Sequence, residues 1–267
     1  MIRFPIACVQ RQTHTDWELF IVCDGCHPET LRVVHAAAAR DRRIRVYDFP
    51  KGERHGEAYR HIALQNATGE AVCYLGDDDL WFPEHLDAMA GLLAENDFAH
   101  TRFVRLSAVS ALFTEEATLD DPAVRARIQQ PPAWNFFGPT CVGHTLEAYR
   151  SLPEGWAPAP KDSHSDLHMW RKWLRQPGLK MFSSPEVTTL SIAQVSRPGM
   201  MPQDRDEELE RWFRTVQSPI PRAILRERLQ GPAAASLPLA ELADEYRRRR
   251  QAAAVEDQGP LLPAVID

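Results

Sequence analysis

The sequence predicts an α/β fold in which a mostly parallel sheet is flanked by helices on both faces, as in Rossmann-like domains. Three observations lead to this fold class. Apolar, strand-like segments alternate with amphipathic, helix-like segments through the first third of the chain. Two of the strand-like segments end in acidic residues, as expected where a parallel sheet presents a ligand site at the carboxyl ends of its strands. The chain has 267 residues, of which 44% are hydrophobic, and this is enough for a sizeable core.

The alternation can be followed element by element. The apolar run at 17–25 ends in Asp-Gly, which is typical of a buried strand that enters a turn. Helical spacing at 55–70 ends near Gly69, a suitable C-terminal cap, and Pro83 suits the first turn of the next helix. In chain order we expect a strand at 17–25, a helix at 28–41, a strand at 43–49, a helix at 55–70, a strand at 71–75 and a helix at 83–96.

The second half of the chain is less regular. The pattern predicts one or two strands at 98–109, a short helix and a loop rich in proline and aromatic residues at 120–139, a helix at 165–176 and a last strand at 187–195. Beyond Arg197 two amphipathic helices are expected, at 204–218 and 237–251. We therefore divide the chain into a domain at 1–197 and a helical C-terminal extension at 198–267, which would cover the core or pair two copies in a homodimer.

Composition and charge exclude several classes of function. The formal net charge of −6 gives no general affinity for nucleic acid. No apolar stretch approaches the roughly 20 residues of a membrane-spanning helix, and the N-terminal segment lacks the pattern of a signal peptide, so we expect a cytoplasmic protein. The C-x-x-C at Cys23 and Cys26 is interpreted as two small residues at a strand end, with a redox pair or a zinc site as the weaker alternatives.

Three consecutive carboxylates, Asp77, Asp78 and Asp79, follow the predicted strand at 71–75. Two unit charges about 4 Å apart repel by about 1 kcal/mol in water and by about 4 kcal/mol at an effective dielectric constant of about 20. A divalent cation together with a phosphate-bearing substrate would neutralise such a cluster, since Mg²⁺ takes one or two carboxylates and completes its shell with phosphate oxygens and water. The alternative is a solvated turn that caps the helix beginning near Pro83.

Three segments, taken together, carry a resemblance to a known family. They are the runs THTDWELFIVCDGCHPETLRVV, RHIALQNATGEAVCYLGDDDLWFPEHL and SDLHMWRKWL. Their order and spacing resemble the family 2 nucleotide-sugar glycosyltransferases with the GT-A fold, especially the bacterial polysaccharide and spore-coat types. The resemblance implies a GT-A-like fold, a UDP-, GDP- or dTDP-sugar donor, a saccharide or other hydroxyl acceptor, Mn²⁺ or Mg²⁺ as cofactor, and transfer with inversion.

The resemblance assigns roles to the acidic segment. Alignment on the Trp and Pro that follow places Asp78 at the second aspartate of the D-x-D motif, as a ligand of the metal and the diphosphate. Asp79 is predicted as a second metal ligand, and Asp77 lies near the ribose and phosphate. Gly76 stands where many relatives have the first aspartate, so the ribose-binding carboxylate is either missing or supplied by Asp77.

The other strand end and the following helix are also implied in donor binding. Asp24 would contact the nucleotide base, within a Cys-Asp-Gly-Cys turn that has one acid fewer than the usual Asp-Asp-Gly-Ser. Arg60 matches an arginine of the family in the helix before the metal strand. From the residues alone, Arg60 could equally be a solvated charge on that helix.

A transfer that inverts the anomeric carbon needs a base to take the proton of the acceptor hydroxyl. The family's base is an acid at the start of a helix, a few residues before a tryptophan, and this implies Asp166 in the run HSDLHMWRKW. The residues alone leave a helix cap as the alternative role of Asp166, because aspartate is a preferred N-cap residue. Asp162 is the fallback base.

The acceptor side is less defined by the sequence. The run GPTCVGHTLEAYR resembles the segment that lines the acceptor pocket, which makes His144 a candidate contact of the acceptor or of a phosphate. The alternative is a packed or surface histidine. Trp134, Phe136 and Phe137 either stack on a sugar face or belong to the core.

The chain departs from the family pattern at its start, and two rival functions follow. The run PIACVQRQTHTDW matches the end of the family's first helix, so we expect an N-terminally truncated domain that lacks the first strand. A catalytically impaired GT-A-like binding or scaffold domain is favoured by that departure and by Gly76, and disfavoured by Asp78 and Asp166. A metal-dependent nucleotidyltransferase would need a Gly-rich, basic loop after its first strand, and the sequence shows none.

Overall fold

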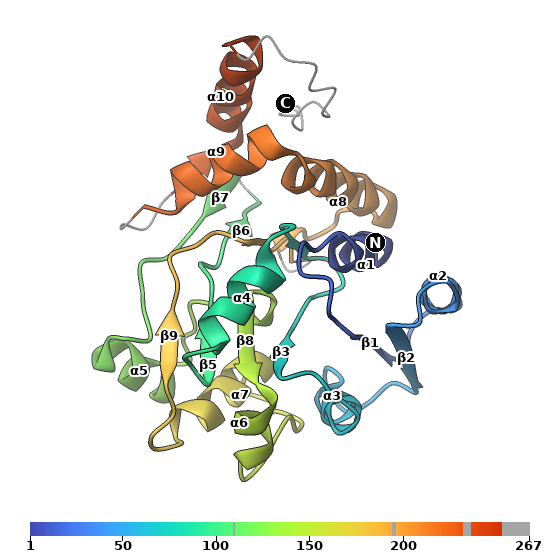
Figure 1. Ribbon diagram of the computed structural model, residues 1–267, viewed down its shortest axis with the longest axis vertical. Helices are drawn as coiled ribbons and strands as arrows, with labels where there is room; N and C mark the ends of the chain where they lie inside the picture. Colours follow the sequence, from blue (N-terminus) through green and yellow to red (C-terminus); the bar gives the residue numbers. More distant parts are fainter. Residues whose placement is uncertain (109, 194–195, 232–235, 253–267) are drawn as a thin grey trace.

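The computed structural model describes residues 1–108, 110–193, 196–231 and 236–252, and it has the predicted α/β class (Figure 1). The expectation of a mostly parallel sheet differs from the structure, because two of the described strand pairs are parallel and the others are antiparallel. The helices are α1 (Arg3–Gln10), α2 (Pro28–Arg40), α3 (Glu57–Leu64), α4 (His85–Leu93), α5 (Pro122–Gln129), α6 (Leu146–Ser151), α7 (Ser165–Leu174), α8 (Pro202–Gln217), α9 (Pro219–Leu229) and α10 (Leu239–Ala252), with a 3₁₀ turn at Pro139–Cys141. The strands are β1 (Leu19–Asp24), β2 (Ile44–Phe49), β3 (Ala71–Cys73), β4 (Leu80–Trp81), β5 (Phe98–His100), β6 (Arg105–Leu106), β7 (Ala111–Phe113), β8 (Val142–Thr145), β9 (Met181–Ser183), β10 (Thr189–Leu190) and β11 (Ser236–Pro238).

The strands β1 and β2 form a parallel pair, in register from Leu19 opposite Ile44 to Asp24 opposite Phe49. Helix α2 connects them and packs on β2, and α3 packs on β1. Pro28 opens α2 at a position where its missing N–H would have no helical partner. This pairing brings the end of β1 and the loop after β2 to the same edge.

A four-stranded sheet in the order β3-β8-β5-β9 forms the second part of the fold. Both β3 and β5 pair with β8 in antiparallel fashion, and β9 is parallel to β5, so β3, β5 and β9 end at one edge. Helices cover both faces, as predicted: Phe98 packs among the tryptophans of α7, and its neighbour Ala99 packs against α4. The antiparallel strand β8 enters at the carboxyl edge, so the segment before it also lies there.

Some predicted boundaries differ from the observed ones for identifiable reasons. The helix expected at 55–70 ends at Leu64, because the backbone N–H groups of Thr68 and Gly69 donate to the carboxylate of Glu18 instead of continuing the helix. Helix α9 was not predicted, since its prolines suggest a loop; they occupy its first turn, where proline is tolerated. Of the strand expected at 187–195, the structure has β10 (Thr189–Leu190). The last two residues of the expected range, 194 and 195, lie outside the described residues.

The C-terminal helices pack on the rest of the chain. Figure 1 shows α8, α9 and α10 grouped at one end of the molecule with α1 beside α8, and α8 contacts both α1 and β4. Phe4, Trp81, Trp212 and Phe213 belong to one buried cluster that spans the predicted boundary at residue 197. The pairing of two copies through these helices stays a prediction. Within the described part of the chain, no helix combines the length and apolar character that crossing a bilayer requires.

Because this cluster is shared, truncating one of its side chains in α8 should destabilise the whole domain. Trp212 is 1% exposed, and its replacement by alanine should lower the free energy of unfolding by about 3–5 kcal/mol. Urea denaturation followed by far-UV circular dichroism should show a single shifted transition. The control is Met201→Ala at the start of the same helix, where the side chain is 64% exposed and a change within about 0.5 kcal/mol is expected. Two separate transitions, with only the smaller one shifted, would instead make 198–267 an independent unit.

Candidate active site at the carboxyl edge of the sheet

Asp24 closes β1, and a loop from β2 folds over its carboxylate. The backbone N–H of Gly52 donates to Oδ1 at 2.6 Å, and the ammonium group of Lys51 donates to Oδ2. Partial burial opposes ionisation, but these hydrogen bonds outweigh it and lower the pKa of Asp24. Gly56 has φ +72°, and a Cβ there would lie 3.2 Å from the Cβ of Asp24, so only glycine combines this conformation with this approach. Asp24 is therefore held as a fixed, ionised carboxylate.

The N-terminus of α3 connects this strand end to the helix that carries the predicted base. Glu57 is buried; its carboxylate accepts from the backbone N–H of His55 at 2.8 Å and from the hydroxyl of Ser165 in α7. Arg54 donates to the backbone oxygen of Ser163, 3.1 Å away, in the loop before α7. These contacts fix the start of α7 beside the loop that encloses Asp24.

Arg60 of α3 is a half-buried cation within electrostatic range of both parts of the site. Burial lowers the pKa of its guanidinium, and the negative charges of Glu57, Asp166 and Asp24 act in the opposite direction. Its guanidinium carbon stands 4.8 Å from the ring centroid of Trp156. The charges of both aspartates act on this half-buried cation, so Asp24 and Asp166 lie within electrostatic range of Arg60.

Asp166 is in the first turn of α7, where Oδ1 accepts from the backbone N–H of Leu167 at 2.8 Å. Its Oδ2 accepts from the side-chain amide of Asn135, 3.0 Å away. Burial raises the pKa of Asp166, and the hydrogen bonds and the nearby His164 reduce the shift. The N-cap of α7 is His164, so Asp166 is not the N-cap residue of the alternative, although its carboxylate accepts from a backbone N–H of the first turn. Its raised pKa favours the role of proton acceptor.

The three consecutive aspartates occupy three different environments. Asp79 points into the protein and is 8% exposed. One of its oxygens accepts from the backbone N–H of Ile192 at 2.9 Å, and the other accepts from the hydroxyl of Thr140. Burial raises the pKa of Asp79 despite these hydrogen bonds. Asp79 therefore anchors the acidic segment to the strands around it, and it is neither a solvated helix cap nor placed as a metal ligand.

Asp78 and Asp77 face outward. The side chain of Asp78 is 20% exposed, and its Oδ2 accepts from Nη2 of Arg205 in α8 at 3.1 Å. Asp77 is exposed. The residue before them, Gly76, packs so closely that an added Cβ would lie 2.9 Å from the carboxylate of Asp79. An aspartate at that position would meet Asp79, which gives a steric reason for the departure from the D-x-D pattern.

The acidic segment fits an open metal site rather than a closed one. In the described residues, no three His, Cys, Asp or Glu side chains gather as a metal-binding group. Mg²⁺ typically uses one or two carboxylates and leaves its other positions to water and substrate phosphates. Asp78 and Asp77 match that donor set, whereas both oxygens of Asp79 are engaged within the protein.

His144 lies in the core of the four-stranded sheet. It is fully buried; its Nε2 pairs with the hydroxyl of Tyr74 at 2.7 Å and its Nδ1 with the backbone oxygen of Thr145 at 3.0 Å. Burial lowers its pKa to about 4. Both ring nitrogens are thus occupied by protein partners, and the structure places His144 as a packed histidine rather than at a ligand surface.

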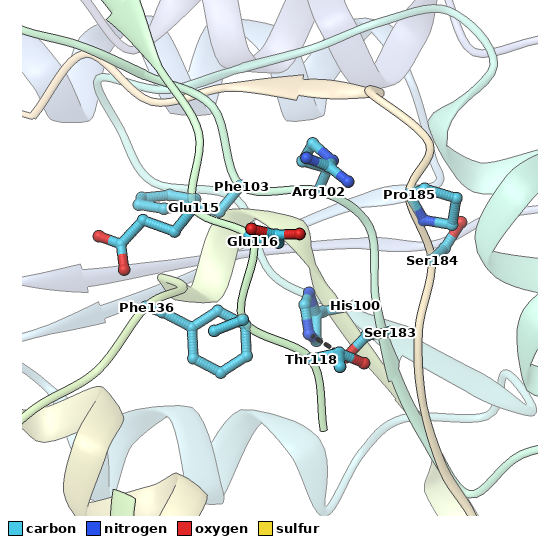
Figure 2. A pocket seen from close by; sticks show the side chains of 11 residues that line it. His100, Arg102, Phe103, Glu115, Glu116, Thr118, Phe136, Ser183, Ser184 and Pro185 are labelled. Carbon is cyan, nitrogen blue, oxygen red and sulfur yellow. Dashed lines mark hydrogen bonds between the residues drawn. The ribbon is translucent and has the colours of Figure 1, made fainter. Parts of the chain in front are cut away.

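A small pocket opens at the ends of β5 and β9 (Figure 2). Arg102, Glu116 and Phe136 line it, and Nη1 of Arg102 is buried with no hydrogen-bond partner in the described part of the structure. Phe136 follows Asn135, which holds Asp166. Phe137, by contrast, is stacked between His100 and α7 in the core. The pocket therefore adjoins the segment that orients the predicted base.

The sequence analysis missed several residues of the site. Lys51, Glu57 and Asn135 lie in loops or at a helix start, where no periodic pattern marks a buried polar residue. Arg205 did carry a signal. It lies four residues before Leu209 in α8, on the stripe that buries the apolar side chains of this helix. An arginine on an apolar stripe indicates a buried partner, and that partner is Asp78.

Three comparisons relate the chain to known proteins. Over 104 residues it is 28% identical to an uncharacterized glycosyltransferase of Rickettsia felis, an alignment that covers 38% of this chain and 17% of the relative's length. The structure of S. aureus TarS 1–349 in complex with UDP-GlcNAc matches with a TM-score of 0.54 and 16% identity, covering 94% of this chain and 69% of the other. The mannosyltransferase PcManGT from Pyrobaculum calidifontis, in complex with GDP-Man and Mn²⁺, matches with a TM-score of 0.51 and 18% identity, covering 97% and 73%. At these identities the two structures show a shared fold, and this fold agrees with the predicted GT-A-like class.

A comparison with protein-family models identifies the family. The sequence model described as Glycosyl transferase family 2 matches residues 1–140, more than half of the chain. The matched region contains Asp24, Arg60 and the acidic segment at 77–79, and it ends at Thr140, which binds Asp79. The chain belongs to glycosyl transferase family 2.

Proposed function

We propose that this protein transfers a sugar from a nucleoside diphosphate donor to an acceptor hydroxyl, with inversion at the anomeric carbon and with a divalent cation in the donor site. The observation that carries the proposal is the link between the strand end that holds Asp24 and the helix start that holds Asp166: Gly56 lies against Asp24, and the next residue, Glu57, accepts a hydrogen bond from Ser165. Family membership supplies the reaction class, and this arrangement joins a donor-side carboxylate to a candidate base. The solved neighbours bound to UDP-GlcNAc and to GDP-Man with Mn²⁺ support a nucleotide-sugar donor.

The donor would bind along the carboxyl ends of β1 and β3. Asp24 accepts from Gly52 and Lys51 but is more exposed than Asp79, and each of its oxygens keeps a second lone pair that would accept from an N–H group of a nucleotide base. Asp77 and Asp78 would hold Mn²⁺ or Mg²⁺ on the diphosphate, and the bound ion would stabilise the negative charge of the leaving group. Arg60 is the nearby cation in the protein itself that could pair with a phosphate oxygen.

On the acceptor side, Asp166 would take the proton of the attacking hydroxyl. A base works best when its pKa lies near the operating pH, and burial moves the pKa of Asp166 in that direction. Asn135 holds one carboxylate oxygen and fixes the orientation of the group. The side chains of Trp134 and Phe136, stacked at 5.5 Å beside the pocket of Figure 2, would form the adjoining acceptor wall.

A screen of nucleotide sugars tests this proposal. We expect one class among UDP-, GDP- and dTDP-sugars to raise the melting temperature only when Mn²⁺ or Mg²⁺ is present, and to release nucleoside diphosphate when an acceptor is added. Metal-dependent binding without any turnover, across a broad set of saccharide acceptors, would favour the alternative of a GT-A-like binding or scaffold domain. Absence of binding to every donor would contradict the proposal.

The role of Asp78 can be tested with Asp78→Asn. Asparagine keeps the shape of the side chain and an oxygen that can accept from Arg205, so the fold should persist. Because the charge is lost, Mn²⁺-dependent binding of the nucleoside diphosphate should weaken by at least about tenfold, as for other weakened carboxylate ligation. Isothermal titration with the donor found in the screen provides the measurement. Glu29→Gln, an exposed acid in α2, serves as the control, and equal affinity in both variants would remove Asp78 from the metal site.

Asp166→Asn separates the base from the helix cap. Asparagine caps about as well as aspartate, so loss of the proton acceptor should reduce the transfer rate by about 10²–10⁴-fold at unchanged donor affinity. A loss below threefold would leave Asp166 with a role at the helix N-terminus and move the assignment to Asp162, which Asp162→Asn then tests. Glu29→Gln, an exposed acid in α2, is the control and should keep the wild-type rate.

The same variant has a predicted pH signature in stability. The pKa of Asp166 is raised in the folded state, so the folded chain binds more protons than the unfolded chain above about pH 4. Stability from this group is therefore present at low pH and falls as the pH rises through the raised pKa. Relative to the wild type, Asp166→Asn should gain stability between about pH 4 and pH 7. Urea midpoints measured across this range check the sign, and a relative loss of stability on raising the pH would contradict it.

A further inference from the structure

Arg205 reaches from the C-terminal helices into the acidic segment. Its side chain is 4% exposed, and Nη2 donates both to Oδ2 of Asp78 at 3.1 Å and to the backbone oxygen of Ile192 at 2.7 Å. The backbone N–H of Ile192 in turn donates to Asp79. The guanidinium of Arg205 thus contacts Asp78 directly. It also hydrogen-bonds Ile192, the residue whose backbone N–H binds Asp79.

The charge of Arg205 is balanced on its other side. Nη1 donates to the carboxylate of Glu208, one turn later in α8, at 2.9 Å. The same carboxylate accepts from Nε of Arg197 at 2.9 Å and 3.0 Å, and the Arg197 side chain is also buried. Asp78, Arg205, Glu208 and Arg197 therefore form a chain of alternating charges with no net charge.

Stability alone does not explain this network. A buried ion pair is commonly no more stabilising than apolar residues of the same volume, because both charges lose their hydration. Nε of Arg205 is also buried without a hydrogen-bond partner among the described residues, which adds a further cost. The neighbouring positions on the same stripe, Leu209 and Trp212, are apolar and belong to the core. An apolar residue at 205 would continue that stripe, so the arginine points to a requirement at Asp78.

We propose that Arg205 is a positioning residue for the donor site: it holds the carboxylate of Asp78 in one orientation, and so makes α8 part of metal and diphosphate binding. This inference rests on the proposed function, since it assigns Asp78 to the metal. Ligating carboxylates are commonly hydrogen-bonded by outer partners, and removal of such a partner typically costs 10–100-fold in metal affinity. Arg205 acts through Asp78.

Glu208 determines whether removal of Arg205 should weaken or strengthen metal binding at Asp78. A lone guanidinium beside Asp78 would repel a divalent cation and compete with it. Here the carboxylate of Glu208 lies as close to Arg205 as Asp78 does, so the long-range field of the cation is largely cancelled. The short-range hydrogen bond that orients Asp78 remains. Removing Arg205 should therefore weaken metal binding rather than strengthen it.

The experiment is a Mn²⁺ titration of the full chain, with free Mn²⁺ measured by electron paramagnetic resonance in the presence of UDP or of GDP. Arg205→Met should weaken Mn²⁺ binding by about 10–100-fold. Arg205→Lys keeps the charge without the two-pronged geometry and should fall between Arg205→Met and the wild type. The matched control is Arg222→Met, which removes an arginine of α9 that pairs with Glu84 at 3.0 Å and does not contact the acidic segment. Binding in this control should stay within twofold of the wild type.

Each outcome decides the inference. Equal Mn²⁺ affinity in the wild type and Arg205→Met, or an equal loss in Arg205→Met and Arg222→Met, overturns it and leaves the proposed function intact. Tighter Mn²⁺ binding in Arg205→Met makes Arg205 a competitor of the ion and also overturns it. If Arg205→Met does not fold, Arg205→Lys decides, with a loss above threefold in support and an unchanged affinity against. A wild-type chain that binds no Mn²⁺ with either nucleotide overturns the proposed metal site together with this inference.

Discussion

Three adjacent carboxylates at the end of β3 cannot share one environment, and much of the structure follows from keeping them apart. Asp79 is turned into the protein, Asp78 is paired with a guanidinium, and Asp77 remains in water. The partners of these carboxylates come from different parts of the chain. The 3₁₀ turn before β8 supplies Thr140, the segment after β10 supplies Ile192, and α8 supplies Arg205. The order of strands and the position of the C-terminal helices are thus tied to one short acidic run.

The part of the candidate site around Arg60 brings charges of opposite sign near one another. Arg60 is half-buried, and a guanidinium that loses part of its hydration requires compensating neighbours. The carboxylates of Glu57, Asp24 and Asp166 meet that need. The two halves also adjoin each other: burial raises the pKa of the Cys141 thiol, and the charges of Asp79 and Asp166 both add to the shift. One buried thiol therefore lies within electrostatic range of the acidic segment and of the candidate base.

Sequence patterns were sufficient for the fold class and for residues at strand ends. Periodicity located β1, α2, β2 and α4 to within a few residues, and the rule that ligands bind at carboxyl ends of strands directed attention to Asp24 and to the acidic segment. Periodicity could not tell which way a neighbouring carboxylate points. Asp77, Asp78 and Asp79 are chemically identical in the sequence, and donors that are distant along the chain, Thr140, Ser191 and Ile192, select Asp79 for the interior. His144 failed as a ligand for the same reason, since its burial depends on contacts from other elements.

The boundary predicted at residue 197 illustrates the difference between composition and energetics. Composition changes there because α8 to α10 are rich in charged residues, and a charged, amphipathic segment resembles an appendage. Packing does not follow that change, because Trp212 and Phe213 share a core with Phe4 and Trp81. Arg205 extends the argument from the core to the site, since its guanidinium lies against Asp78. A residue beyond the region matched by the family model thus contacts Asp78 within that region, so α8 is physically joined to the acidic segment.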